Sequence, residues 1–167
     1  MTVNWEIHPI EPEVLAELRQ RDDAGRAPRL LVDEEGGSPL RCCLRPIEPG
    51  EKVALVSYAP LRRWAAGTGA EPGPYDEVGP VFIHAEPCPG HPGRDFPERL
   101  TRSHRVLRAY GSDGQILGGR LVEPGPAGDA GTIQAALTEL FGDPEVALVQ
   151  VRAVEFGCFT FGARRAA

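Results

Sequence analysis

Proline and glycine recur along the whole chain, and they limit its fold more than any other feature of the sequence. The 167 residues include 17 prolines and 20 glycines. Proline cannot donate a backbone hydrogen bond inside a helix or a central strand, and glycine weakens both kinds of element. The sequence therefore predicts short helices and strands that are joined by long, partly rigid loops.

Three segments have helical patterns. The segment 12–24 begins with Pro12, which suits a first helical turn, and Gly25 follows it as a stop signal. The segment 132–141 carries apolar residues at helical spacing and ends before a glycine. We predict helices over both segments and a third, short helix over 97–100.

Seven further runs are strand-like, and proline or glycine separates them. They are 41–45, 52–58, 80–85, 105–110, 115–122, 146–152 and 156–161. Turns are predicted at 48–51 and at 111–114. A repeated strand–helix–strand order is absent, so we predict an α+β fold. Its mostly antiparallel, twisted sheet would carry two or three packed helices in a single domain over residues 1–167.

Composition narrows the class of protein. Hydrophobic residues make up 41% of the chain and charged residues 25%, as in ordinary globular proteins. The net charge of −6 argues against nucleic acid as a partner, because such binding needs a basic surface. The first residues lack a secretory signal, and no apolar run reaches the ~20 residues that cross a bilayer. We expect a cytoplasmic protein without membrane contact, whose four cysteines are reduced.

His84 is the first candidate for chemistry. It lies in the predicted strand 80–85, where Phe82 shares its face and apolar residues occupy the other. An imidazole exchanges protons near neutral pH and can act as a general acid or base. The alternative is a core histidine whose ring is satisfied by hydrogen bonds. Tyr110 is a further candidate, which could donate a hydrogen bond to a ligand.

Three arginines stand in or at the end of predicted strands: Arg45, Arg108 and Arg152. A partly buried guanidinium needs a carboxylate, phosphate or carbonyl partner. If these arginines converge with His84, they form a pocket for an anion. The alternative is that each lies on the solvent face and pairs with a surface glutamate.

The cysteines allow two further interpretations. His84, Cys88 and His91 lie within eight residues, and with Cys158 they could supply four zinc ligands. Paired CxxC motifs are missing, and the prolines around Cys88 restrict the loop, so no metal is assigned. Cys158 or Cys88 could instead be a nucleophile, whereas a free cysteine is usually a small buried hydrophobe.

Motifs for common cofactors are absent. The sequence lacks a Walker motif, a dinucleotide-binding glycine fingerprint, a GxSxG elbow and an HExxH helix. We therefore predict no cofactor.

Several motifs in a fixed order resemble a known family. They are 79–85 (GPVFIHA) followed by Cys88, then 105–110, Val151-Arg152 with 156–159 (FGCF), and Cys43-Leu44-Arg45 with Pro49-Gly50-Glu51. Over about residues 28–162 they resemble the bacterial family called domain of unknown function 1203. In that family a histidine often precedes the late arginine by two positions, where this chain has Gln150. The resemblance implies a shared fold and no defined activity.

The leading hypothesis is a cofactor-independent enzyme or binding protein for an anionic small molecule. Arg45, Arg108 and Arg152 would hold a carboxylate or phosphate, while His84, Tyr110 and Cys158 would be the catalytic candidates. The alternative is a non-catalytic interaction module for another protein or a second copy of the chain. A second alternative is a domain stabilised by zinc at His84, Cys88, His91 and Cys158.

Overall fold

The computed structural model describes residues 4–92, 95–124 and 131–167. The strands are β1 (Trp5–His8), β2 (Arg29–Asp33), β3 (Glu51–Tyr58), β4 (Gly79–His84), β5 (Arg105–Gly111), β6 (Ile116–Val122), β7 (Val146–Ala153) and β8 (Phe159–Arg165). The α-helices are α1 (Pro12–Leu18), α2 (Pro60–Thr68) and α3 (Gly131–Phe141). Single 3₁₀ turns form at η1 (Gly73–Tyr75) and η2 (Glu98–Leu100).

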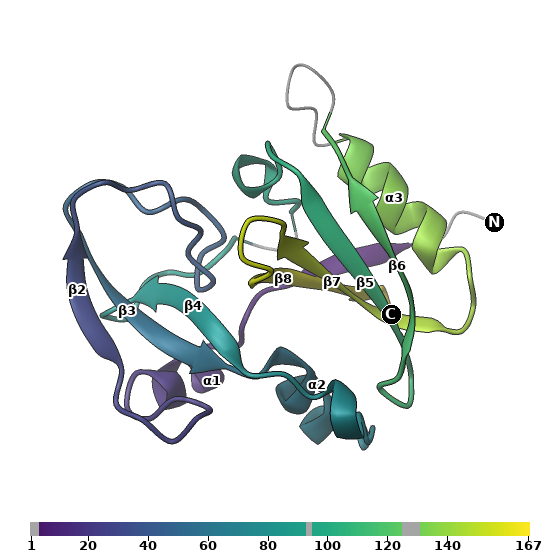
Figure 1. Cartoon of the computed structure of the whole chain (residues 1–167), viewed down its shortest axis with the longest axis horizontal. Coiled ribbons are helices and arrows are strands. Elements are labelled where there is room, and N and C mark those ends of the chain that lie inside the picture. The colour runs from purple at the N-terminus through teal and green to yellow at the C-terminus, as the bar shows by residue number, and fades with distance from the viewer. Residues whose placement is uncertain (1–3, 93–94, 125–130) are drawn as a thin grey trace.

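The strands form two antiparallel sheets rather than one. The larger sheet has the order β1-β8-β7-β5-β6, and the smaller has the order β2-β3-β4 (Figure 1). The predicted α+β class and the antiparallel pairing are confirmed. The first strand pairs with the last, so the two ends of the chain meet in the larger sheet.

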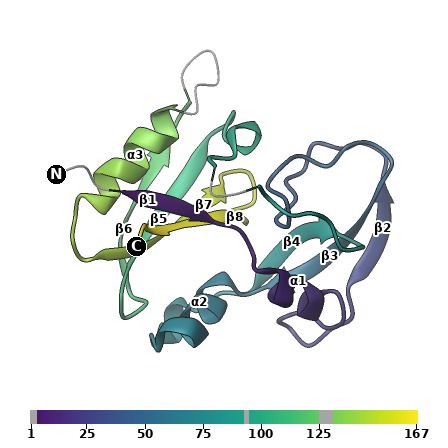
Figure 2. The ribbon, with the colours of Figure 1, turned by 180° about the vertical axis from the view of Figure 1, so that it is seen from behind.

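Each sheet has its own core. Helix α3 covers one face of the larger sheet with Ile133, Leu137 and Phe141, which pack among apolar side chains of β5 and β7. Helix α1 packs on the smaller sheet through Leu15 and Leu18. Figures 1 and 2 show both pairings from opposite sides, with α2 beneath the junction of the sheets. No helix in the described part of the chain is long and apolar enough to cross a bilayer.

The predicted strand at 41–45 is wrong. This segment forms a turn in which the Leu44 N–H donates to the Leu40 carbonyl at 3.1 Å, as in one turn of helix. Leu44 has a positive φ of 56°, which a continuing strand or helix does not contain. We call residues 40–45 the RCC turn, after the sequence Arg41-Cys42-Cys43 inside it.

Other boundaries also differ from the predictions. Helix α1 stops at Leu18 because the following chain turns back, with the Asp22 N–H donating to the Arg26 carbonyl at 2.8 Å. Strand β8 begins at Phe159, since 154–158 form a loop around Gly157, which has a positive φ of 74°. Strands β1 and β2 and helix α2 were not predicted at all.

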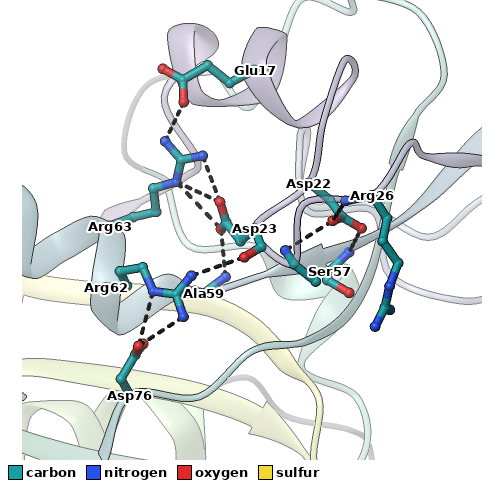
Figure 3. Close-up of polar contacts among 10 residues, drawn as sticks. Glu17, Asp22, Asp23, Arg26, Ser57, Ala59, Arg62, Arg63 and Asp76 are labelled. Carbon is teal, nitrogen blue, oxygen red and sulfur yellow. Dashed lines mark hydrogen bonds and ion pairs between the residues drawn. The ribbon is translucent and has the colours of Figure 1, made fainter. Parts of the chain in front are cut away.

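Two aspartates fasten both small helices to the end of β3. The Asp22 carboxylate accepts backbone N–H groups of Ala24, Arg26 and Ser57. Figure 3 shows the neighbouring carboxylate of Asp23 between the Ala59 N–H and the Arg63 guanidinium, at 2.8 and 2.7 Å. Arg63 also pairs with Glu17 of α1, and Arg62 with Asp76. These contacts fix the smaller sheet and α2 relative to each other.

Candidate functional site

A cleft of about 740 Å³ lies at the junction of the two sheets. Residues of β3 and β4, among them Leu55 and Phe82, which share one face of the smaller sheet, line one wall. The β7–β8 loop, 154–158, supplies part of the other. The cleft therefore arises where two separately packed sheets meet, and its lining comes from segments far apart in the sequence.

Arg41 of the RCC turn lies deep beside this cleft. Its side chain donates to the carbonyls of Phe159 and Pro39, at 2.7 and 2.5 Å, and the residue is only 4% exposed. Burial, together with the charge of Arg105, lowers the pKa of Arg41 to about 10. Within the described residues, its Nη2 has no hydrogen-bond partner and its charge has no carboxylate partner. Arg41 thus remains a cation at pH 7 with donor capacity to spare.

Arg105, at the start of β5, lines the same cleft and is 6% exposed. It donates to the carbonyls of Leu100 and His104 and to the Ser103 hydroxyl. Burial lowers its pKa, and the charge of Glu155 opposes that shift. No described carboxylate forms an ion pair with it.

The β7–β8 loop adds an aromatic ring and a thiol. Phe156 lines the cleft although it is 91% exposed, so its ring is not part of a core. Cys158 also lines the cleft, and a thiolate at this position would stabilise the charged guanidinium of Arg41. Cys158 is the one predicted catalytic residue that borders this cavity in the described structure.

Three of the predicted site residues meet on the face of the larger sheet opposite α3. Arg108 and Arg152 both pair with the Glu77 carboxylate, at 2.6 and 3.2 Å. Arg152 also donates to Gln150, which accepts from the Tyr110 hydroxyl at 3.4 Å. Arg108, Arg152 and Tyr110 are therefore close together, and the two arginines share the single negative charge of Glu77.

His84 and Arg45 form a separate group around Glu51. The Glu51 carboxylate lies 2.7 Å from His84 Nε2 and 2.9 Å from Arg45 Nη2. Neither Arg108 nor Arg152 has a hydrogen bond or ion pair with His84 in the described structure. The six predicted residues are thus distributed over three places, and the three arginines do not surround one pocket.

The other ring nitrogen of His84 faces sulfur. The thiols of Cys42 and Cys43 lie 3.4 and 3.8 Å from Nδ1, and Cys88 completes the group. Among the described residues these four side chains are close enough to hold a metal ion. His91 and Cys158 do not join them: the His91 ring bonds to the Asp95 carbonyl, and Cys158 borders the cleft.

A family model described as "Protein of unknown function (DUF1203)" matches residues 37–165. The chain belongs to the DUF1203 family. Among curated proteins and among solved structures, no match to it is found. The matched region of this DUF1203 protein includes the cleft arginines, the His84 group and the Arg108–Arg152 pair.

Sequence reasoning missed Arg41, Arg105 and the ligand-type pair Cys42 and Cys43. Arg41 stands between apolar Leu40 and Cys42. In a strand these two neighbours share one face and Arg41 takes the other, so the local pattern places Arg41 toward solvent and gives no sign of its burial. No local signal marks Arg105 as a cleft residue, because the cleft residues of β3, β4 and the RCC turn all lie more than twenty positions away from it in the chain.

Proposed function

We propose that this DUF1203 protein binds a small organic anion, a carboxylate or a phosphate, in the cleft between its two sheets. One observation carries the proposal: Arg41 and Arg105 are both more than nine-tenths buried beside one cleft, and neither forms an ion pair with a carboxylate among the described residues, Glu155 acting on Arg105 only from a distance. A buried cation is costly unless a negative charge compensates it. An anion in the cleft would provide that charge for both.

The rest of the lining suggests that the ligand is organic. Leu55 and Phe82 offer apolar surface, and the exposed ring of Phe156 can stack on a flat ligand. A volume of about 740 Å³ falls within the range of small-molecule sites. The ligand would therefore combine an anionic group with an apolar or aromatic part.

Binding is proposed here rather than acid–base catalysis. His84 lies with Arg45 and Glu51 and is not among the residues that line the cleft. Arg108 and Arg152 pair with Glu77, so they would act by holding the segment before β4 in place beside the cleft. Cys158 lines the cleft, and its thiol could react with an electrophilic ligand.

The proposal is tested with a thermal-shift panel of aliphatic and aromatic carboxylates, phosphorylated sugars, nucleotides and inorganic phosphate. A ligand that binds only the folded state raises the melting temperature by mass action. We expect one anion class to stabilise the wild type. Arg41→Met should weaken its binding about 10- to 100-fold, since a charged hydrogen bond contributes roughly 1.5–3 kcal/mol.

The matched control is Arg102→Ala, which removes an exposed arginine three positions from Arg105. It should leave the affinity unchanged if position rather than net charge matters. If Arg41→Met does not fold, Phe156→Ala replaces it, because an exposed ring can be removed without loss of core packing. Equal weakening by Arg102→Ala, or no stabilisation of the wild type by any anion, would refute the proposal.

A protein-interaction module is the second candidate function. It is favoured by leucines that are exposed on β2 and β6, each of which is an outer strand of its sheet, among them Leu30 and Leu121. An outer strand with exposed apolar side chains can pair with another chain. Sedimentation of wild type and Leu121→Lys tests this for a second copy. If the protein is such a module for its own copies, the wild type should sediment as a dimer and Leu121→Lys as a monomer.

A further inference from the structure

Three thiols and one imidazole meet where β4 ends. Cys42 and Cys43 come from the RCC turn, His84 is the last residue of β4, and Cys88 lies in the loop that follows. Their ligand atoms all lie within 4.8 Å of one another. Thiols are weak hydrogen-bond partners, so hydrogen bonding alone gives little reason to gather three of them around one ring.

The spacing of these atoms fits a tetrahedral metal site. With zinc–sulfur bonds of about 2.3 Å and a zinc–nitrogen bond of about 2.0 Å, two sulfurs lie about 3.8 Å apart and sulfur and nitrogen about 3.5 Å apart. The sulfurs of Cys42 and Cys43 are 3.9 Å apart, and they lie 3.4 and 3.8 Å from His84 Nδ1. Little movement would be needed to enclose an ion.

Glu51 sets the tautomer that such a site needs. His84 Nε2 is 2.7 Å from the Glu51 carboxylate and 3.3 Å from Arg45 Nη2. Because a carboxylate accepts and a guanidinium donates, Nε2 can serve only one of them, and the shorter distance indicates that it donates to Glu51. The lone pair is then on Nδ1, which faces the sulfurs. A carboxylate behind a ligating histidine is a regular feature of zinc sites.

Donors also surround the sulfurs. The His84 backbone N–H lies 3.2 Å from Cys42 Sγ. Arg19 donates through Nε to the His84 carbonyl, while its Nη2 is buried without a hydrogen-bond partner in the described structure. A buried guanidinium N–H without an acceptor is rare. Three thiolates and one Zn²⁺ carry a net charge of −1, which this cation would offset.

We propose that Cys42, Cys43, His84 and Cys88 bind one structural zinc ion, with Glu51 as the positioning residue for His84. Thiolate and imidazole ligands select zinc over Mg²⁺ and Ca²⁺, which prefer oxygen. Because protein side chains fill all four positions, the ion has no open position for a substrate. It fastens the RCC turn to the end of β4.

Metal content and cobalt substitution test the site on the full-length protein, purified under reducing conditions without chelators. We expect one zinc ion per chain by mass spectrometry. Cobalt exchanged for zinc should give the thiolate-to-cobalt charge-transfer absorption and the visible bands of a tetrahedral site. Cys43→Ser and Cys88→Ser should lose these bands. Glu51→Gln should keep them and weaken metal affinity about 10- to 100-fold in competition with a chromogenic chelator.

Cys158→Ser is the matched control, since it removes the fourth cysteine of the chain, which lies outside the cluster. It should keep both the stoichiometry and the cobalt spectrum. The proposal is overturned if the folded, reduced wild type takes up neither zinc nor cobalt. It is also overturned if Cys158→Ser abolishes the spectrum as completely as Cys43→Ser, or if the cluster thiols prove to be joined in a disulfide.

Discussion

Arginines of this protein differ in what compensates their charge. The Arg152 guanidinium contacts Glu77, Gln150 and the Gly157 carbonyl. Arg41 reaches backbone carbonyls alone. At the scale of single residues, this difference separates an arginine that holds structure from one with capacity for a ligand. The sequence could not make that distinction, because Glu77 and Gly157 lie far from one another along the chain.

Arg152→Met tests this difference directly. The variant keeps the apolar stem but removes the ion pair with Glu77, one of the two donors to Gln150 and the donor to the Gly157 carbonyl. We expect the free energy of unfolding to fall by about 2–3 kcal/mol in urea titrations. Arg108→Met is the matched control, and it should cost at most about 1 kcal/mol because its ion pair is partly exposed. A stable Arg152→Met protein that no longer binds its anion would instead make Arg152 a ligand residue.

At the scale of elements, the RCC turn is a segment that contacts both sheets. Leu40 and Cys42 pack in the core of the smaller sheet, whereas Leu44 packs in the core of the larger one. The same turn places Arg41 beside the cleft. One turn thus contacts both cores and the cleft, and it carries two of the proposed zinc ligands.

The local pattern of apolar and polar residues was sufficient to predict some elements of the fold and insufficient to predict others. The run 80–85 alternates apolar faces and was confirmed as β4, and the 111–114 turn joins β5 to β6 as predicted. Helix α2 had a readable signal in Pro60 followed by Leu61, Trp64 and Ala65, which share one face. The RCC turn had no such signal, because its shape depends on how it packs between the two sheets rather than on its own residues.

The loop after α1 gives a prediction for pH. Burial of Asp22 opposes its ionisation, but backbone N–H groups of Ser57, Arg26 and Ala24 outweigh burial and lower its pKa. A lowered carboxyl pKa contributes stability that is complete above the unfolded value of about 3.9 and is lost as pH falls through the folded value. We therefore expect the free energy of unfolding to decline below about pH 4.

Asp22→Asn isolates this contribution from that of other carboxyl groups. The variant cannot ionise, so it should be less stable than wild type at pH 7, and the difference should shrink as the pH falls below about 4. Urea titrations of both proteins at a series of pH values measure it. A difference that stays constant across the acid range would mean that Asp22 acts through shape alone.

On the scale of the whole molecule, the decisive feature is the meeting of two sheets. Tyr58 of β3 and Phe159 of β8 stack edge to face there, with ring centres 5.5 Å apart. The pairing of β1 with β8 joins residues about 155 positions apart. The spacing of apolar residues and the composition of a segment describe each strand separately. They contain no information on which sheet a strand joins. The cleft therefore could not be predicted from the sequence.

The two proposals meet in the RCC turn, and this gives a prediction for the molecule as a whole. Zinc would fix Cys42 and Cys43, which directly follow Arg41. Removing the ion frees the turn, so Arg41 no longer lies ready beside Arg105 and must be ordered when the anion binds. We expect chelation to lower the melting temperature and to weaken anion binding at least about threefold, because ordering even one residue costs roughly 1 kcal/mol.

Calorimetric titration of the stabilising anion into zinc-loaded and chelated protein measures this coupling. Linkage requires that the anion in turn tighten zinc binding by the same factor, which a chelator competition can check independently. The control is Cys158→Ser, because Cys158 borders the cleft but does not belong to the thiol cluster. Chelation should weaken anion binding by this variant as much as it does in the wild type. Equal anion affinity with and without zinc would show that the turn is held in place by the two cores, Leu40 and Leu44 being sufficient.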